Sequence, residues 1–118
     1  MEVTHAIQGH PRADIRPLLL TLSSLDSVRK AAERVLQMTL VVDVLINNAG
    51  VMMTPTYQTT PEGLEWHFGV NYIGHFLFTN LIMPALLKAA DGACVVNVSS
   101  AAHRAIGVNF DDVNFQVC

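Results

Sequence analysis

Two apolar runs of the sequence, residues 41–46 and 94–98, each end in a cluster of small polar residues. The first is followed by the segment NNAG at residues 47–50, and the second by Ser99-Ser100. An asparagine amide both donates and accepts hydrogen bonds, and a glycine lets the backbone approach a ligand closely. A serine hydroxyl can donate a hydrogen bond to an oxygen on which negative charge develops. These residue types suit a site that binds a small molecule and stabilises charge during a reaction.

A third candidate group lies between the two clusters. His67, Asn71 and His75 recur four residues apart and would share one face of a helix. A metal ion would need a further ligand beside them, and the pattern supplies none, so no metal site is predicted. Asn71 is either a satisfied amide in the core or a functional group. The asparagines at residues 47–48 have a turn as their alternative interpretation, and the serines at 99–100 have a helix cap.

The apolar segments alternate between strand-like and helix-like patterns. Strands are expected at residues 18–22, 41–46 and 94–98, with one helix after Ser24 and a second from Thr60 to about Ala90. This alternation is typical of an α/β fold with a parallel sheet, in which the run at 41–46 would be covered on both faces. Ligands bind at the carboxyl ends of such strands, and both polar clusters fall there.

Capping residues set the expected helix boundaries. Ser23 and Ser24 supply hydroxyls before a helix whose apolar positions recur every three or four residues from Val28 to Leu36. Thr60 is the expected cap of the second helix, with a proline at its first position. That helix is expected to bend before its internal proline at position 84.

Composition limits the classes of function. The chain has 118 residues, 51% of them hydrophobic and only 14% charged, with a net charge of −3. This balance argues against a nucleic-acid or anionic-membrane partner, which would need clustered Lys and Arg. Two cysteines cannot build a disulfide framework, so a reducing, cytoplasmic setting is expected, with Cys94 as a small core residue. Membrane association of a longer protein stays open.

A transmembrane helix is the alternative for residues 66–87, which contain no Asp, Glu, Lys or Arg. The run is long enough to span a bilayer. It also contains Asn71, His75 and Asn80, whose polar groups would need partners inside the membrane. A helix buried in a protein core or in a subunit interface is therefore the preferred interpretation.

These motifs together resemble the short-chain dehydrogenase/reductase family, over about residues 13–116. The segment NNAG at 47–50, Asn71 in the following helix and VVNVSS at 95–100 occur in the order and at spacings similar to those of the family. The segment LSSL at 22–25 and the run GHF at 74–76 further resemble the branch with retinol dehydrogenases and WW-domain oxidoreductases. The resemblance implies a partial Rossmann-type fold, a doubly wound parallel sheet, here with three strands and two to three helices.

The resemblance also implies roles for individual residues. Ser100 would orient a carbonyl oxygen, and Asn71 would support a proton relay through a water molecule. The cofactor would be NADP or NAD, with NADP slightly favoured, and the substrate an alcohol, aldehyde or ketone. The positions that match the family's cofactor-binding residues are Thr21, Asn47, Asn48, Ala49, Gly50 and Val98. Thr21 stands where the family usually carries an aspartate near the adenine ring.

Two parts of the family pattern do not occur in the sequence. It contains no glycine-rich turn between a first strand and helix, and no tyrosine followed four residues later by lysine. We therefore expect residues 1–118 to be a single partial domain without the first βαβ unit and the C-terminal part, irregular at 1–14 and 105–118. The sequence is interpreted as a truncated gene model, splice variant or pseudogene product, and the isolated chain is expected to be inactive. The alternative is a non-catalytic partner that docks onto a full-length relative through residues 66–90.

Overall fold

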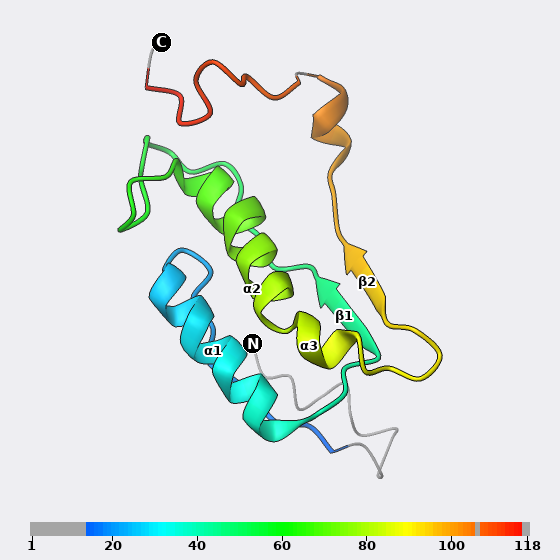
Figure 1. The fold of residues 1–118 in the computed structure, drawn as a ribbon. Helices are drawn as coiled ribbons and strands as arrows, with labels where there is room; N and C mark the ends of the chain where they lie inside the picture. Colours follow the sequence, from blue (N-terminus) through cyan, green and yellow to red (C-terminus); the bar gives the residue numbers. More distant parts are fainter. Residues whose placement is uncertain (1–13, 106, 117–118) are drawn as a thin grey trace.

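The computed structural model describes residues 14–105 and 107–116, and most of the segment expected to be irregular at 1–14 lies outside this part. Figure 1 shows the helices gathered on one side of a small sheet. In chain order the elements are α1 (Leu25–Met38), β1 (Val44–Asn47), the π-helix η2 (Phe68–Gly74), α2 (His75–Leu81), α3 (Met83–Leu86), β2 (Cys94–Asn97) and the 3₁₀-helix η3 (Ala101–Arg104).

The sheet is parallel, as predicted. Val44 pairs with Cys94 and Asn47 with Asn97, so the two strands run in register and end together. The helical segment from η2 to α3 forms the crossover between them, and α1 packs against α2. The α/β class and the partial Rossmann-type architecture are confirmed.

The strand predicted at residues 18–22 is wrong. This segment forms no strand, and the sheet of the described residues has two strands rather than three. Leu18 and Leu20 pack against the core and Leu22 is 9% exposed, so the apolar pattern is used for burial. A strand also needs a neighbouring ladder of backbone groups, and the described chain provides none for this segment.

The sheet is also less covered than predicted. Val44 is 57% exposed and Ile46 is 61% exposed, while Leu45 and Asn47 are partly or fully buried. Cys94 is exposed too, which corrects its expected place in the core. Successive strand residues point to opposite faces, so the helices of the described chain cover one face of β1 and leave its other face open, while all residues of β2 are exposed.

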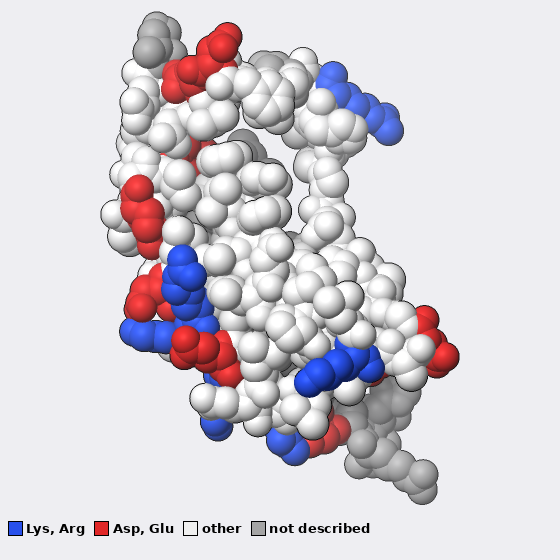
Figure 2. All heavy atoms as spheres, viewed as in Figure 1, with Lys and Arg blue, Asp and Glu red and all other residues white. Residues whose placement is uncertain are grey.

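Helix α1 begins where the sequence predicts. The Ser24 hydroxyl accepts a hydrogen bond from the Ser27 amide at 3.3 Å, which satisfies one free donor of the first turn. Val28 and the two alanines after it are buried, whereas Asp26 and Lys30 form an exposed ion pair on the other face. In Figure 2, positive and negative side chains gather at the left edge, where Figure 1 places α1, and much of the rest of the face in view is uncharged.

The second helix does not begin at Thr60. Residues 60–63 form a turn, and the helical segment begins at Trp66. The Glu65 carboxylate accepts hydrogen bonds from the backbone amides of His67, at 3.0 Å, and Phe68, at 2.7 Å. Glu65 therefore takes the capping role that we expected of Thr60, because it reaches two amides that lack helical partners. The bend predicted before the internal proline is confirmed, with a break at Ile82.

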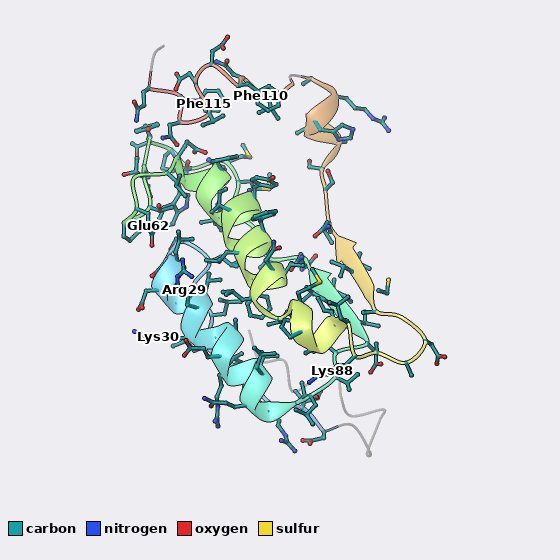
Figure 3. All side chains as sticks on the ribbon, in the orientation of Figure 1. Arg29, Lys30, Glu62, Lys88, Phe110 and Phe115 are labelled. Carbon is teal, nitrogen blue, oxygen red and sulfur yellow. The ribbon has the colours of Figure 1, made fainter. Side chains whose placement is uncertain are left out.

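A second glutamate joins the turn to α1. Glu62 Oε1 accepts a hydrogen bond from the backbone amide of Leu25 at 2.7 Å, and Figure 3 shows Glu62 next to the start of α1. This hydrogen bond is the main reason that the pKa of Glu62 lies below its usual value. Burial would raise the pKa of Glu65, but hydrogen bonds from His67 and Phe68 outweigh it and hold that pKa below its usual value.

We expect acid to destabilise the fold through these two carboxylates. Each has a lower pKa in the folded chain than in the unfolded chain, so its stabilising effect is complete above the ordinary value of 4.5. This contribution is lost as the pH falls through the lowered folded pKa. Urea unfolding followed between pH 6 and pH 3 should therefore show a falling midpoint, and Glu65→Gln should flatten the fall.

The matched control for this prediction is Glu33→Gln, on the exposed face of α1. In the plateau above the ordinary glutamate pKa, Glu65→Gln should cost about 0.5–2 kcal/mol, the usual range for a helix cap. An unchanged slope in Glu65→Gln would show that Glu65 does not cap the helix.

The core lies between α1 and the helical segment. Its two largest fully buried side chains are Val28 and Ile82, and Asn47 and Thr60 are the polar residues buried within the described chain. None of the helices of this part is long and apolar enough to cross a membrane.

Candidate functional site

A cavity of about 440 Å³ opens at the carboxyl ends of β1 and β2, and we call it the polar cavity because most of its lining residues carry polar side chains. This is the edge at which parallel sheets bind ligands. Residues from the ends of both strands and from one face of the helical segment line it: Asn47, Asn71, Tyr72, His75, Phe76, Thr79, Asn80, Asn97, Val98 and Ser99.

Asn47 ties the two strands and the helix together at this cavity. It is 6% exposed, and its Nδ2 donates hydrogen bonds to Thr79 Oγ1 at 3.0 Å and to Asn97 Oδ1 at 2.8 Å. The backbone carbonyl of Asn47 also accepts a hydrogen bond from the Val98 amide at 3.0 Å. A buried amide with this set of partners fixes the relative positions of the groups around the cavity.

Asn71 holds the loop that follows β1. Its Oδ1 accepts a hydrogen bond from the Val51 amide at 2.8 Å, and its Nδ2 donates to the Val51 carbonyl at 2.9 Å. A Cβ on Gly50 would stand 3.1 Å from Asn71 Oδ1, so glycine lets the loop lie this close to the helix. The side chain of Asn71 is therefore committed to the loop.

The π-helix places Asn71 in this position. Single π-helical turns inside α-helices occur frequently at functional sites, because they change which side chains share a face. The carbonyl of Asn71 in η2 lies 2.9 Å from Nδ1 of His75, the first residue of α2. Along the same helix the rings of Phe68, Tyr72 and Phe76 follow one another with centroid distances of 5.4 and 6.1 Å.

Ser100 lies just outside the cavity. Its neighbour Ser99 lines the cavity, whereas Ser100 is exposed and caps η3, with its Oγ accepting a hydrogen bond from the Ala102 amide at 3.2 Å. The hydroxyl uses a lone pair in this contact, so its proton remains available to a ligand oxygen. The two interpretations of Ser100, a cap and a donor, are therefore compatible.

The predicted cofactor residues divide into three groups. Asn47 and Val98 line the cavity together with Asn71. Asn48, Ala49 and Gly50 are exposed on the loop beside it. Thr21 does not line the cavity. It lies in the turn before α1, where its amide donates a hydrogen bond to Ser27 Oγ at 3.0 Å.

Sequence reasoning missed the two partners of Asn47. Asn97 pairs with Asn47 in the sheet register, so two polar residues at equivalent positions of the strands were the available signal. Thr79 lies eight residues after Asn71, a spacing that returns to nearly the same side of a helix. Both contacts depend on how the helix packs on the sheet, which the sequence pattern does not specify.

The imidazoles near the site are engaged in local contacts. His67 Nδ1 lies 2.8 Å from Glu65 Oε1, and His103 Nδ1 contacts the Ser100 carbonyl. No group of three or more His, Cys, Asp or Glu side chains within residues 14–105 and 107–116 is placed to hold a metal ion.

The cavity fits one part of a nicotinamide dinucleotide better than the other. Its polar side chains are mainly uncharged amides and hydroxyls, and no Lys or Arg lies among the described residues that line it. Such groups suit the hydroxyls and carboxamide of a nicotinamide riboside, because they both donate and accept hydrogen bonds. A pyrophosphate would instead need cations or a glycine-rich turn at a helix N-terminus.

Comparison with known proteins decides the family. The family model for short chain dehydrogenases matches residues 1–110. The chain belongs to the short-chain dehydrogenase family. This confirms the resemblance found in the NNAG segment, Asn71 and the VVNVSS segment.

Several members of the short-chain dehydrogenase family are close in sequence. Human retinol dehydrogenase 13 is 48% identical over 82% of this chain and 29% of its own length. Human polyprenol dehydrogenase is 42% identical over 86% of this chain and 31% of its own length. The chain therefore spans less than a third of the length of these relatives, which confirm its place in a retinol dehydrogenase-like branch.

Solved structures support the same fold. An uncharacterised protein from Mycobacterium paratuberculosis matches 96% of this chain and 38% of its own, with 34% identity and a TM-score of 0.73. The NADPH-bound carbonyl reductase from chicken fatty liver matches 84% of this chain and 42% of its own, with 26% identity and a TM-score of 0.59.

Proposed function

We propose that this chain forms the central segment of an NAD(P)-dependent oxidoreductase that interconverts an alcohol and a carbonyl compound. The observation that carries the proposal is the polar cavity at the strand ends. There the Asn71 side chain forms two hydrogen bonds with the Val51 backbone, and Gly50 lets the loop after β1 lie close to Asn71. Its uncharged donors and acceptors suit the nicotinamide riboside end of the cofactor, which supplies the hydride when bound.

Two residues would act on the substrate side. Ser100, which follows β2, donates a hydrogen bond to the substrate oxygen. The Ala102 amide occupies only a lone pair of Ser100 Oγ, so the hydroxyl proton is free for this contact. Asn71 supports the proton relay, as the resemblance implies; its side-chain amide binds Val51, and its backbone carbonyl lies 2.9 Å from His75 Nδ1.

NADP is the proposed cofactor rather than NAD. The support is the retinol dehydrogenase-like branch together with the NADPH-bound carbonyl reductase among the solved relatives. The substrate is proposed to be an alcohol, aldehyde or ketone with an apolar body, since relatives are named for retinol and polyprenol.

The isolated 118-residue chain is proposed to be inactive. A tyrosine followed four residues later by a lysine, the acid/base pair that the resemblance implies, does not occur in its sequence. Loss of one member of a catalytic unit typically costs several orders of magnitude in rate.

The test compares the recombinant chain with the native protein. An antibody against residues 26–40, largely on α1, would isolate the native protein for intact-mass measurement and for assay with NADPH and a panel of aldehydes and ketones. We expect a product of more than twice 12.9 kDa that oxidises NADPH, and a recombinant chain equal to the no-enzyme control. A native product without activity towards NADPH or NADH would contradict the proposal.

A second candidate function is docking onto a longer relative through residues 66–90. The supporting observation is the exposed aromatic row, in which Tyr72 is 55% exposed and Phe76 is 58% exposed. Exposed apolar patches of this kind mark interaction surfaces. A native product of about 12.9 kDa that co-purifies with a longer relative would favour this candidate, and a lone monomer would count against it.

A further inference from the structure

A second cavity, of about 620 Å³, lies between the start of the helical segment and the end of the described chain. Figure 1 shows the segment after β2 arching over that end of the helix, and Figure 2 shows a hollow beneath the arch. The cavity is lined by Glu65, His67, Phe68, Asn71, His103, Gly107, Val108, Asn109, Val113 and Phe115.

Asn114 links the arch to the loop and turn before the helical segment. Asn114 Oδ1 accepts a hydrogen bond from the Glu65 amide at 2.9 Å, and Asn114 Nδ2 donates to the Gly63 carbonyl at 3.4 Å. The Tyr57 hydroxyl donates a hydrogen bond to the Asn114 carbonyl at 2.9 Å. Asn114 thereby positions residues 107–115 as the outer wall of the cavity.

The lining suits an uncharged ligand. Phe68, Val108, Val113 and Phe115 supply apolar walls. The Glu65 carboxylate also lines the cavity, and none of the described residues that form it is Lys or Arg, so an anionic ligand would meet no cation there. His67 and His103 direct Nδ1 to oxygen acceptors within the chain, which leaves Nε2 of each ring to accept a hydrogen bond from a ligand hydroxyl. Mainly apolar walls with a few polar groups are typical of small-molecule sites, and the volume lies in their usual range of about 300–1,000 Å³.

The two cavities are neighbours. Asn71 lines both the apolar cavity and the polar cavity at the strand ends. A molecule whose apolar body lies in the apolar cavity could therefore direct a hydroxyl or carbonyl group towards the polar cavity.

We propose that the apolar cavity binds the apolar body of the substrate and that residues 107–115, positioned by Asn114, determine which bodies fit. This inference deepens the proposed function, on which it rests for the identity of the ligand as a substrate. Val108 and Val113 are the proposed specificity residues of the wall, and Asn114 is a positioning residue.

The binding test uses the full 118-residue chain and farnesol, an uncharged isoprenoid alcohol, as the probe. Farnesol is titrated while amide NMR signals are followed, and farnesyl diphosphate serves as a charged probe with the same apolar body. We expect saturable shifts at Gly107, Val108 and Val113 with farnesol and weaker binding of the diphosphate. Shifts spread evenly over the chain, or none, would overturn the proposal.

Two matched variants test whether farnesol binds at the cavity wall or on any exposed apolar surface. Val108→Glu should weaken farnesol binding about tenfold or more, because it places a charge against the apolar body. Val44→Glu is the control, since Val44 has similar exposure, 57% against 64%, and lies on the open face of the sheet. Equal effects of the two variants would overturn the proposal.

The role of Asn114 has its own test. Asn114→Ala should weaken farnesol binding, whereas Asn114→Asp keeps the acceptor for the Glu65 amide and should retain part of the affinity. Equal loss in both variants, with amide spectra otherwise like those of the parent chain, would contradict a positioning role.

A separate titration with nicotinamide mononucleotide distinguishes this inference from the proposed function. Shifts at Val51 and Val98 would report the polar cavity alone. Farnesol binding with no nucleotide response and an inactive native protein would contradict the proposed function but leave the apolar site. If the native protein is active but Val108→Glu leaves farnesol binding to the 118-residue chain unchanged, only the further inference is contradicted.

Discussion

A chimera of human retinol dehydrogenase 13 that carries this chain in place of its matching segment is expected to lose about 10²–10³-fold in kcat when Ser100 is changed to alanine. The reason is that Ser100 would donate a hydrogen bond to the oxygen on which negative charge develops, and alanine offers no donor. The measurement is the initial rate of NADPH-dependent aldehyde reduction at saturating substrate.

The Ser100 hydroxyl has two separable roles, because its oxygen caps η3 and its proton is the predicted donor to the substrate. Ser100 Oγ accepts from the Ala102 amide at 3.2 Å, so loss of the cap is a second consequence of the substitution. Ser100→Asp retains an acceptor for that amide but has no hydroxyl to donate, and it should therefore be as inactive as alanine. Ser23→Ala, at the turn before α1, is the control for hydroxyl removal outside the cavity. Full activity in Ser100→Asp would contradict the proposed role.

Gly74→Ala is expected to produce the largest loss of stability, about 1–3 kcal/mol in the free energy of unfolding. A Cβ at this position would stand 2.6 Å from the Leu22 carbonyl oxygen and 3.1 Å from Leu22 Cβ. Both residues are buried, so the helix and the segment before α1 must move apart to admit a methyl group. Urea unfolding followed by circular dichroism measures the effect.

Gly107→Ala is the matched control for this substitution. A Cβ on Gly107 would meet no atom within 4 Å, and the substitution should leave the urea midpoint nearly unchanged. Equal midpoints for Gly74→Ala and Gly107→Ala would show that the close approach between Gly74 and Leu22 does not occur in solution. A small domain has only about 5–15 kcal/mol of total stability, so a loss of this size is easily measured.

The site could be predicted from the sequence in its location but not in its contacts. The parallel sheet rule placed the NNAG segment and the two serines at one edge, and the structure has a cavity there. The sequence did not reveal that Asn71 binds Val51 with its whole amide, or that Asn47 binds Thr79. These contacts join residues 20 and 32 positions apart, and their geometry depends on the π-helical turn and on helix packing.

The sequence by itself determined the features that depend on near neighbours and on motif order. The Ser24 cap and the apolar face of α1 follow from local hydrogen bonding and helical period, and the ordered motifs identified the family. The tertiary structure decided where long-range partners exist. Residues 18–22 have the composition of a strand, but the part of the chain that the structure describes offers them no adjacent strand. Glu65, rather than Thr60, caps the second helix because its carboxylate reaches two free amides. A pattern of residue types specifies what a segment can bury or bond, whereas only the packed chain supplies the partner.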